Sequence, residues 1–139
     1  MTTYESSSEV DTFELAKKIS QKAKKGEIYC LDGDLGAGKT HFAKGFAFGL
    51  GVEREITSPT FTIMNIYEAD IPFYHFDVYR LSGFQEMEAI GYEEYFFGEG
   101  ICLIEWSEII KEIIPNSAVK ITIKKNFEKG ENYRLIEVN

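Results

Sequence analysis

Apolar residues recur along this chain at helical and strand-like spacings by turns. Between Asp11 and Gly26 they follow one another every three to four positions, which predicts an amphipathic helix with Asp11 as its N-cap. Lysines near the end of that segment and the glycine after it are typical of a helix C-terminus. The same reasoning predicts helices over residues 11–25, 39–48, 84–90 and 107–114.

Between these helices lie short apolar or alternating runs that predict strands. They cover residues 27–32, 60–67, 73–79, 101–105, 119–123 and 133–138. Turn-forming residues join 60–67 to 73–79 and 119–123 to 133–138, so we expect two hairpins. Strand–loop–helix units followed by a late hairpin indicate an α/β sandwich with a mixed sheet.

Length and charge restrict the function. The 139 residues fit one domain spanning 1–139. Its 15 basic against 23 acidic residues give a net charge of −8, which opposes direct binding to a nucleic acid backbone. Apolar runs fall far short of the roughly 20 residues that span a bilayer, and the N-terminus has no features of an export signal. We expect a cytoplasmic protein without membrane association, with Cys30 and Cys102 as buried free thiols.

One motif has strong chemical meaning. Gly33-x-x-x-x-Gly38-Lys39-Thr40 matches the phosphate-binding loop pattern, and it lies between a predicted strand and a predicted helix as that pattern requires. Glycines allow the backbone to approach phosphates closely, Lys39 supplies charge to the β- and γ-phosphates, and the Thr40 hydroxyl is a Mg²⁺ ligand. The expected nucleotide-binding residues are Gly33, Asp34, Leu35, Gly36, Ala37, Gly38, Lys39 and Thr40. The fold class is therefore a P-loop NTPase-like three-layer sandwich with a mixed, mainly central parallel sheet and a C-terminal hairpin.

The motif leaves the class of nucleotide protein open. The sequence lacks the Asn-Lys-x-Asp motif that selects guanine, so ATP is the expected nucleotide. Small-molecule kinases usually carry an arginine-rich lid, whereas this chain has only the widely spaced Arg54, Arg80 and Arg134. An ATPase is the leading interpretation. A small-molecule kinase is the alternative, and a nucleotide-dependent binding module without turnover is a third.

Three further segments resemble parts of a nucleotide site. Ile101-Cys102-Leu103-Ile104-Glu105 is an apolar strand that ends in an acid, as in a Walker-B element. The acid would serve Mg²⁺ at the carboxyl end of the strand, with an acid that merely ends a strand at the surface as the alternative. Asp77 lies among aromatic residues, where a carboxylate is costly unless it is paired or at the edge of a site. It is a candidate for orienting water or holding the metal shell, with a structural salt bridge as the alternative. The turn at residues 57–61 would present Thr60 to the γ-phosphate, although a simple turn into a strand explains it nearly as well.

Taken in order, these segments closely resemble the TsaE family of small bacterial P-loop ATPases of tRNA threonylcarbamoyladenosine biosynthesis. The resemblance covers essentially the whole chain and is strongest in four motifs: Gly-Asp-Leu-Gly-Ala-Gly-Lys-Thr at 33–40, Ser-Pro-Thr-Phe at 58–61, His-Phe-Asp-Val-Tyr-Arg-Leu at 75–81 and Ile-Glu-Trp at 104–106. It implies an ATPase that works with the TsaB–TsaD pair, which transfers a threonylcarbamoyl group to N6 of adenosine 37 in tRNA. The tRNA would be contacted only indirectly.

The resemblance also implies roles for single residues. Thr40 and Glu105 correspond to Mg²⁺ ligands, Asp77 to an acid needed for hydrolysis, and Thr60 to a switch-like threonine. Trp106 matches a tryptophan beside the Walker-B acid, and the stretch near Glu9 and Val10 would lie by the adenine. The family commonly has threonine where this chain has His41. As the second residue of a helix, His41 is expected to point away from the phosphates.

Overall fold

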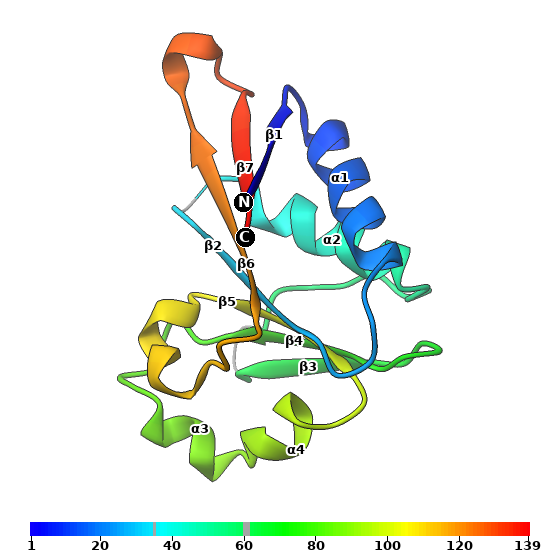
Figure 1. The fold of residues 1–139 in the computed structure, drawn as a ribbon, viewed down its shortest axis with the longest axis vertical. Helices are drawn as coiled ribbons and strands as arrows, with labels where there is room; N and C mark the ends of the chain where they lie inside the picture. Colours follow the sequence, from blue (N-terminus) through cyan, green and yellow to red (C-terminus); the bar gives the residue numbers. More distant parts are fainter. Residues whose placement is uncertain (35, 60–61) are drawn as a thin grey trace.

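The computed structural model describes residues 1–34, 36–59 and 62–139 (Figure 1). Its strands form one sheet in the order β1-β7-β6-β2-β5-β4-β3. The elements are β1 (Thr2–Ser6), α1 (Glu9–Gln21), β2 (Ile28–Gly33), α2 (Lys39–Gly49), β3 (Met64–Tyr67), β4 (Phe73–Asp77), α3 (Gln85–Ala89), α4 (Tyr92–Phe96), β5 (Ile101–Glu105), the 3₁₀ helix η1 (Ser107–Ile113), β6 (Val119–Lys125), the 3₁₀ helix η2 (Phe127–Lys129) and β7 (Arg134–Val138).

The centre of the sheet is parallel and its edges are antiparallel. Strand β2 pairs in parallel with β5 and β6, and β5 pairs in parallel with β4. Both predicted hairpins are confirmed, because β3–β4 and β6–β7 are antiparallel. In register, Glu105 lies opposite Leu31 of β2 and Asp77 of β4, so the carboxyl ends of these three strands meet at one edge.

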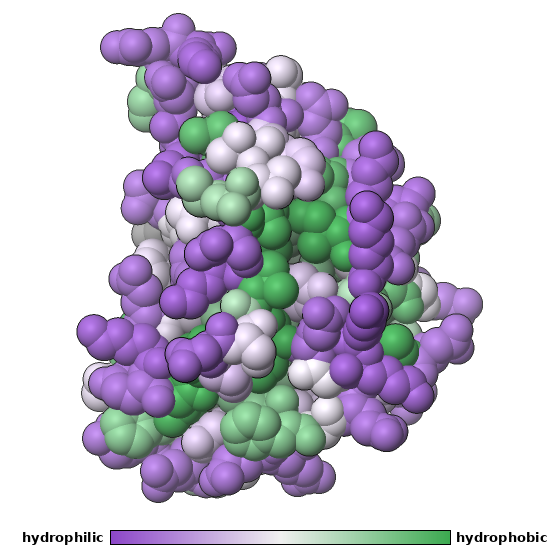
Figure 2. Space-filling view, in the orientation of Figure 1, coloured by the Kyte–Doolittle hydropathy of each residue, from purple (hydrophilic) through white to green (hydrophobic). Residues whose placement is uncertain are grey.

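Two hydrophobic cores lie on opposite faces of the sheet, which makes the fold a three-layer sandwich. On one face, helices α1 and α2 pack on side chains such as Leu31, Phe73 and Leu103. On the other, α3, α4 and η1 cover Cys30 and Phe76 together with Cys102 and Ile104. Figure 1 shows the pair α1–α2 and the pair α3–α4 on opposite sides of the central strands. Helix side chains that face the sheet are therefore buried, and polar residues form most of the margin in Figure 2.

Helices α1 and α2 lie unusually close together because α2 carries a glycine at the contact. A Cβ atom placed on Gly45 would come within 2.2 Å of the backbone oxygen of Phe13. Only a residue without a side chain allows this approach. The packing brings the N-terminus of α1 beside the N-terminus of α2, where the phosphate loop ends.

Several predicted boundaries were wrong for local reasons. Helix α1 begins at Glu9, because Ser8 rather than Asp11 is its N-cap, with the Ser8 hydroxyl accepting from the Asp11 N–H. Strand β3 begins at Met64, so residues 62 and 63 of the predicted strand lie before it, and residues 60 and 61 lie outside the described residues. Strand β4 ends at Asp77, where the carboxylate accepts from the Tyr79 N–H and turns the chain.

The predicted helix at 107–114 is the 3₁₀ helix η1, and strand β1 and helix α4 were not predicted. Within the described part of the chain, no helix has the length and apolarity to cross a membrane. Cys30 and Cys102 are buried and free, as expected. Burial raises the pKa of the Cys30 thiol to about 11 and that of Cys102 to about 12, so neither is a reactive thiolate at neutral pH.

Candidate nucleotide-binding site

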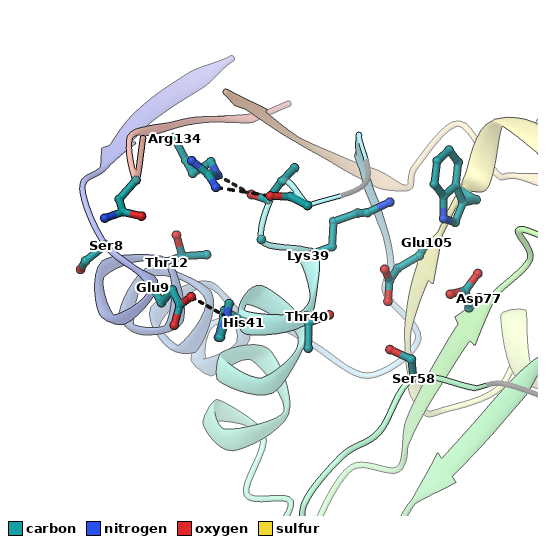
Figure 3. A pocket seen from close by; sticks show the side chains of 15 residues that line it. Ser8, Glu9, Thr12, Lys39, Thr40, His41, Ser58, Asp77, Glu105 and Arg134 are labelled. Carbon is teal, nitrogen blue, oxygen red and sulfur yellow. Dashed lines mark hydrogen bonds and ion pairs between the residues drawn. The ribbon is translucent and has the colours of Figure 1, made fainter. Parts of the chain in front are cut away.

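A cavity of about 350 Å³ opens where the carboxyl ends of β4 and β5 meet the phosphate loop and α2. Its wall also includes the start of α1, Ser58 before β3, and β7. Figure 3 shows two sides of this cavity, with Lys39, Glu105 and Asp77 on one and Glu9, His41 and Arg134 on the other. A crevice outside the carboxyl ends of parallel strands is the usual ligand site of an open α/β sheet.

The phosphate loop leaves β2 at Gly33 and enters α2 at Lys39. Gly38 adopts φ 103° as the N-cap of α2, a conformation that favours glycine, and within the described residues no side chain caps this helix. Gly33 is required for another reason, since a Cβ there would lie 2.8 Å from the carbonyl oxygen of Ile123. Among the described residues, no acceptor outside the helix is found for the N–H groups of the first turn of α2, and these groups are donors suited to an anion.

Lys39 has a buried ammonium with no hydrogen-bond partner among the described residues. The residue is only 7% exposed, and its Nζ has no hydrogen-bond partner there. The ammonium lies 3.9 Å above the centroid of the Trp106 ring. The Asp32 and Asp77 carboxylates are close enough to interact with it electrostatically, but neither forms a hydrogen bond with it. A buried charge is normally hydrogen-bonded as well as paired. The geometry therefore suits an anionic group at the phosphate loop.

Trp106 has an unusual backbone conformation, which contacts of its neighbours maintain. Its φ of 63° is in the left-handed region, unlike every other non-glycine residue of the described chain. The next residue, Ser107, donates both its N–H and its hydroxyl to the Asp32 carboxylate at the end of β2. Burial raises the pKa of Asp32 and the Ser107 hydrogen bonds lower it. The ring centroids of Tyr79 and Trp106 are 4.7 Å apart. The indole that covers Lys39 is therefore held by the backbone at Ser107 and by the packed Tyr79 ring.

Glu105 and Asp77 end neighbouring strands at the same edge. His75 Nε2 lies 2.7 Å from Glu105 Oε2, and both side chains are buried. Burial raises the pKa of the Asp77 carboxyl, the Tyr79 N–H lowers it, and the nearby Glu105 charge raises it further. Two carboxyl groups thus lie at one end of a cavity with a lysine ammonium, the arrangement expected around a metal–phosphate group.

The profile of the family described as threonylcarbamoyl adenosine biosynthesis protein TsaE matches residues 6–134. The chain belongs to the TsaE family. A Bacillus subtilis protein named tRNA threonylcarbamoyladenosine biosynthesis protein TsaE is 48% identical over 116 residues, which cover 83% of this chain and 72% of the relative. A Treponema pallidum protein of the same name is 40% identical over 114 residues, or 82% of this chain and 84% of the relative. The crystal structure of Bacillus subtilis YdiB superposes with a TM-score of 0.80 at 40% identity, covering 97% of this chain and 82% of that one. The predicted α/β fold class is thereby confirmed.

Most of the residues predicted from the sequence to bind nucleotide or metal lie together in the wall of the cavity. Its wall includes Glu9, Gly36, Ala37, Gly38, Lys39, Thr40, Asp77 and Glu105. Gly33 and Asp34 belong to the loop but lie outside the cavity wall, and the Asp34 carbonyl accepts from the Ala37 N–H. Leu35 and Thr60 lie outside the described residues, and their proposed roles stay predictions.

The sequence predicted no neighbour for His41, and whether it points away from the phosphates stays a prediction. It lines the cavity, and its Nε2 lies 3.2 Å from Glu9 Oε1 (Figure 3). The contact arises because α1 packs against α2 and presents Glu9 to the first turn of α2. Position on a helix alone could not reveal this neighbour.

Other residues in or beside the cavity carried no functional signal in the sequence. Arg134 was one of three scattered arginines, yet it lines the cavity and donates to carbonyls of the phosphate loop. For Asp32, the sequence pattern predicted only the end of a strand. The remaining wall residues without a predicted role are Ser8, Thr12, Ser58 and Asn132.

The donor set suits Mg²⁺ bound together with phosphates. Among the described residues, no group of three or more His, Cys, Asp and Glu side chains is arranged to hold a metal ion. Mg²⁺ typically uses one or two protein oxygens, waters and substrate phosphates instead of an all-protein cage. The Thr40 hydroxyl and the Glu105 carboxylate, both in the cavity wall, are the residues that fit this role.

Proposed function

We propose that this protein binds and hydrolyses Mg-ATP as an accessory subunit of tRNA threonylcarbamoylation, the modification of N6 of adenosine 37. The observation that supports nucleotide binding is the buried Lys39 ammonium, without a hydrogen-bond partner among the described residues, at the end of a glycine-rich loop and the start of α2. Membership of the TsaE family supports the pathway.

In this proposal the phosphates bind to the N–H groups of the loop and of the first turn of α2. Lys39 contacts the β- and γ-phosphates, and Thr40 and Glu105 hold Mg²⁺ directly or through water. The metal would neutralise charge that develops on the phosphates. Asp77 would orient the attacking water, and Thr60 would contact the γ-phosphate. Glu9, at the far side of the cavity, would lie by the adenine, as the family resemblance implies.

The TsaB–TsaD pair is the proposed partner. Thr40 is exposed, so phosphates bound there would be partly hydrated, which weakens the electrostatic stabilisation on which phosphoryl transfer depends. A docked partner would exclude water or add a cation. The net charge of −8 supports indirect contact with tRNA through that partner.

Incubation with ATP labelled at the γ-phosphate tests the reaction class. An ATPase yields free labelled phosphate, slowly alone and faster with the TsaB–TsaD pair. A small-molecule kinase, which is the alternative, transfers the labelled phosphate to an acceptor molecule. A binding module without turnover neither releases nor transfers the labelled phosphate. Absence of phosphate release both with and without the pair would contradict the proposal.

A further inference from the structure

Arg134 connects the β6–β7 hairpin to the phosphate loop. Its Nε donates to the carbonyl oxygen of Ala37 at 2.8 Å, and Nη2 donates to that of Gly36 at 3.3 Å (Figure 3). Nη1 donates to the carbonyl oxygens of Glu131 at 2.9 Å and Tyr133 at 2.7 Å. One guanidinium is therefore bonded to four backbone carbonyls, two in the loop and two in the hairpin.

The bond to Ala37 sets the direction of a neighbouring N–H. The peptide bond between Ala37 and Gly38 is trans, so its carbonyl oxygen and the Gly38 N–H point to opposite sides. Holding the oxygen toward Arg134 directs that N–H away from the hairpin. Gly38 cannot fix this orientation itself, because it has no side chain and a Cβ there would meet nothing within 4 Å.

The hairpin brings a second cation to the same loop. Lys125 lies opposite Arg134 in the β6–β7 register, and its Nζ is 3.1 Å from the position that a Cβ would take on Gly36. Arg134 differs from this exposed lysine in being half-buried and bonded through a planar fork. Lys125 adds positive charge near the loop, whereas Arg134 adds both charge and hydrogen bonds of fixed direction. A variant that keeps the charge at position 134 but loses the fork therefore tests which of the two the site needs.

We infer that Arg134 is a positioning residue of the nucleotide site, which holds the carbonyl side of the phosphate loop so that the Gly38 N–H faces the phosphates. The inference rests on the proposed nucleotide binding and extends it, because it makes the C-terminal hairpin part of the site. A guanidinium satisfies two loop carbonyls at once, whereas a lysine ammonium keeps the charge and loses that fork.

The test compares Mg-ATP affinity of the full chain and its Arg134→Gln and Arg134→Lys variants by calorimetry. Both variants are expected to bind about tenfold more weakly or worse, since each loses charge-assisted hydrogen bonds. Lys124→Ala is the matched control. It removes a cation of the neighbouring strand β6 that pairs with Glu137 at 2.6 Å and lies outside the cavity wall, and it should bind as the parent does.

The outcomes separate the possible roles. Near-parental affinity in Arg134→Lys would overturn the inference, because it would mean that charge acts directly on the nucleotide. Parental affinity in Arg134→Gln would overturn it too. If Arg134→Gln does not fold, Arg134→Lys decides alone. Failure of the parent chain to bind Mg-ATP would contradict the proposed function instead.

Amide NMR spectra add a readout that general destabilisation would not produce. In the Arg134→Lys variant without nucleotide, the signal of Gly38 should shift while those of α1 stay in place. An unchanged Gly38 signal would contradict the positioning role.

Discussion

Lys39 and Asp77 show how the sandwich assigns different chemistry to single side chains of one cavity. The Lys39 ammonium is buried over an indole ring and has no hydrogen-bond partner in the described chain. Asp77 is only half-buried, next to another carboxylate and a backbone donor. The first environment suits binding of an anion, and the second suits a group that acts on water or on the metal shell.

Replacing Lys39 by alanine should weaken ATP binding about tenfold to hundredfold, because a charge-assisted contact contributes about 1.5–3 kcal/mol. The fold should survive, since the ammonium points into the cavity. Calorimetric titration of the folded variant measures the effect. Lys44→Ala, on the same helix but outside the cavity wall, is the control and should bind normally. Unchanged affinity in Lys39→Ala would contradict the phosphate-loop assignment.

Asp77→Asn should leave ATP binding close to normal and reduce phosphate release at least about tenfold, the loss expected when a positioned acid–base group is removed. The asparagine oxygen can still accept from the Tyr79 N–H, so the turn after β4 is kept. Steady-state phosphate release at saturating ATP checks this. Equal rates in variant and parent would assign Asp77 a structural role.

The same variant has an expected pH signature in stability. Because the folded-state pKa of Asp77 is raised, mainly by burial, ionisation costs stability as the pH rises from about 3.8 through that raised value. Asp77→Asn avoids this cost. It should therefore unfold at a higher temperature than the parent at neutral pH, with the difference shrinking as the pH falls through that window. A difference that grew toward acid pH would contradict the assigned cause.

At the scale of elements, the close contact of α1 and α2 determines which residues reach the cavity. Gly45 lets the two helices approach, and that approach brings Glu9 to His41 at the first turn of α2. The N-terminal helix is thus part of the cavity wall as well as of the sandwich.

Gly45→Ala should destabilise the protein by about 1–3 kcal/mol, because the added methyl overlaps the Phe13 backbone and the helices must separate. In a helix free of such a contact, the same change would stabilise by up to about 1 kcal/mol. Urea unfolding distinguishes the two cases by the sign of the change in the free energy of unfolding. A rise in the midpoint would mean that the close approach is unimportant.

Local patterns predicted the elements whose signals are local. The β2–loop–α2 unit, the Glu105 strand and both hairpins followed from short apolar runs and turn residues. Strand β1 did not, because Thr2–Ser6 is polar and becomes a strand by pairing with β7. The contacts of Arg134 with Ala37 and of Ser107 with Asp32 join residues 97 and 75 positions apart, and one sequence holds no signal for such pairs.

At the scale of the whole molecule, the sheet brings nearly all the proposed chemistry to one edge. The ends of β2, β4 and β5 supply the loop and both acids, while α1 and the β6–β7 hairpin form the opposite wall. This arrangement suits a protein that binds nucleotide by itself and completes its site against a partner. We expect slow hydrolysis alone and faster hydrolysis with the TsaB–TsaD pair.

The most direct test of the account is the amount of threonylcarbamoyladenosine formed on tRNA by the TsaB–TsaD pair over many turnovers, with this protein or its Glu105→Ala variant added. The account predicts continued modification with the parent chain and a stall after the first turnovers with Glu105→Ala, because Mg²⁺ would no longer be positioned. Undiminished turnover with the variant, or without any added chain, would contradict it.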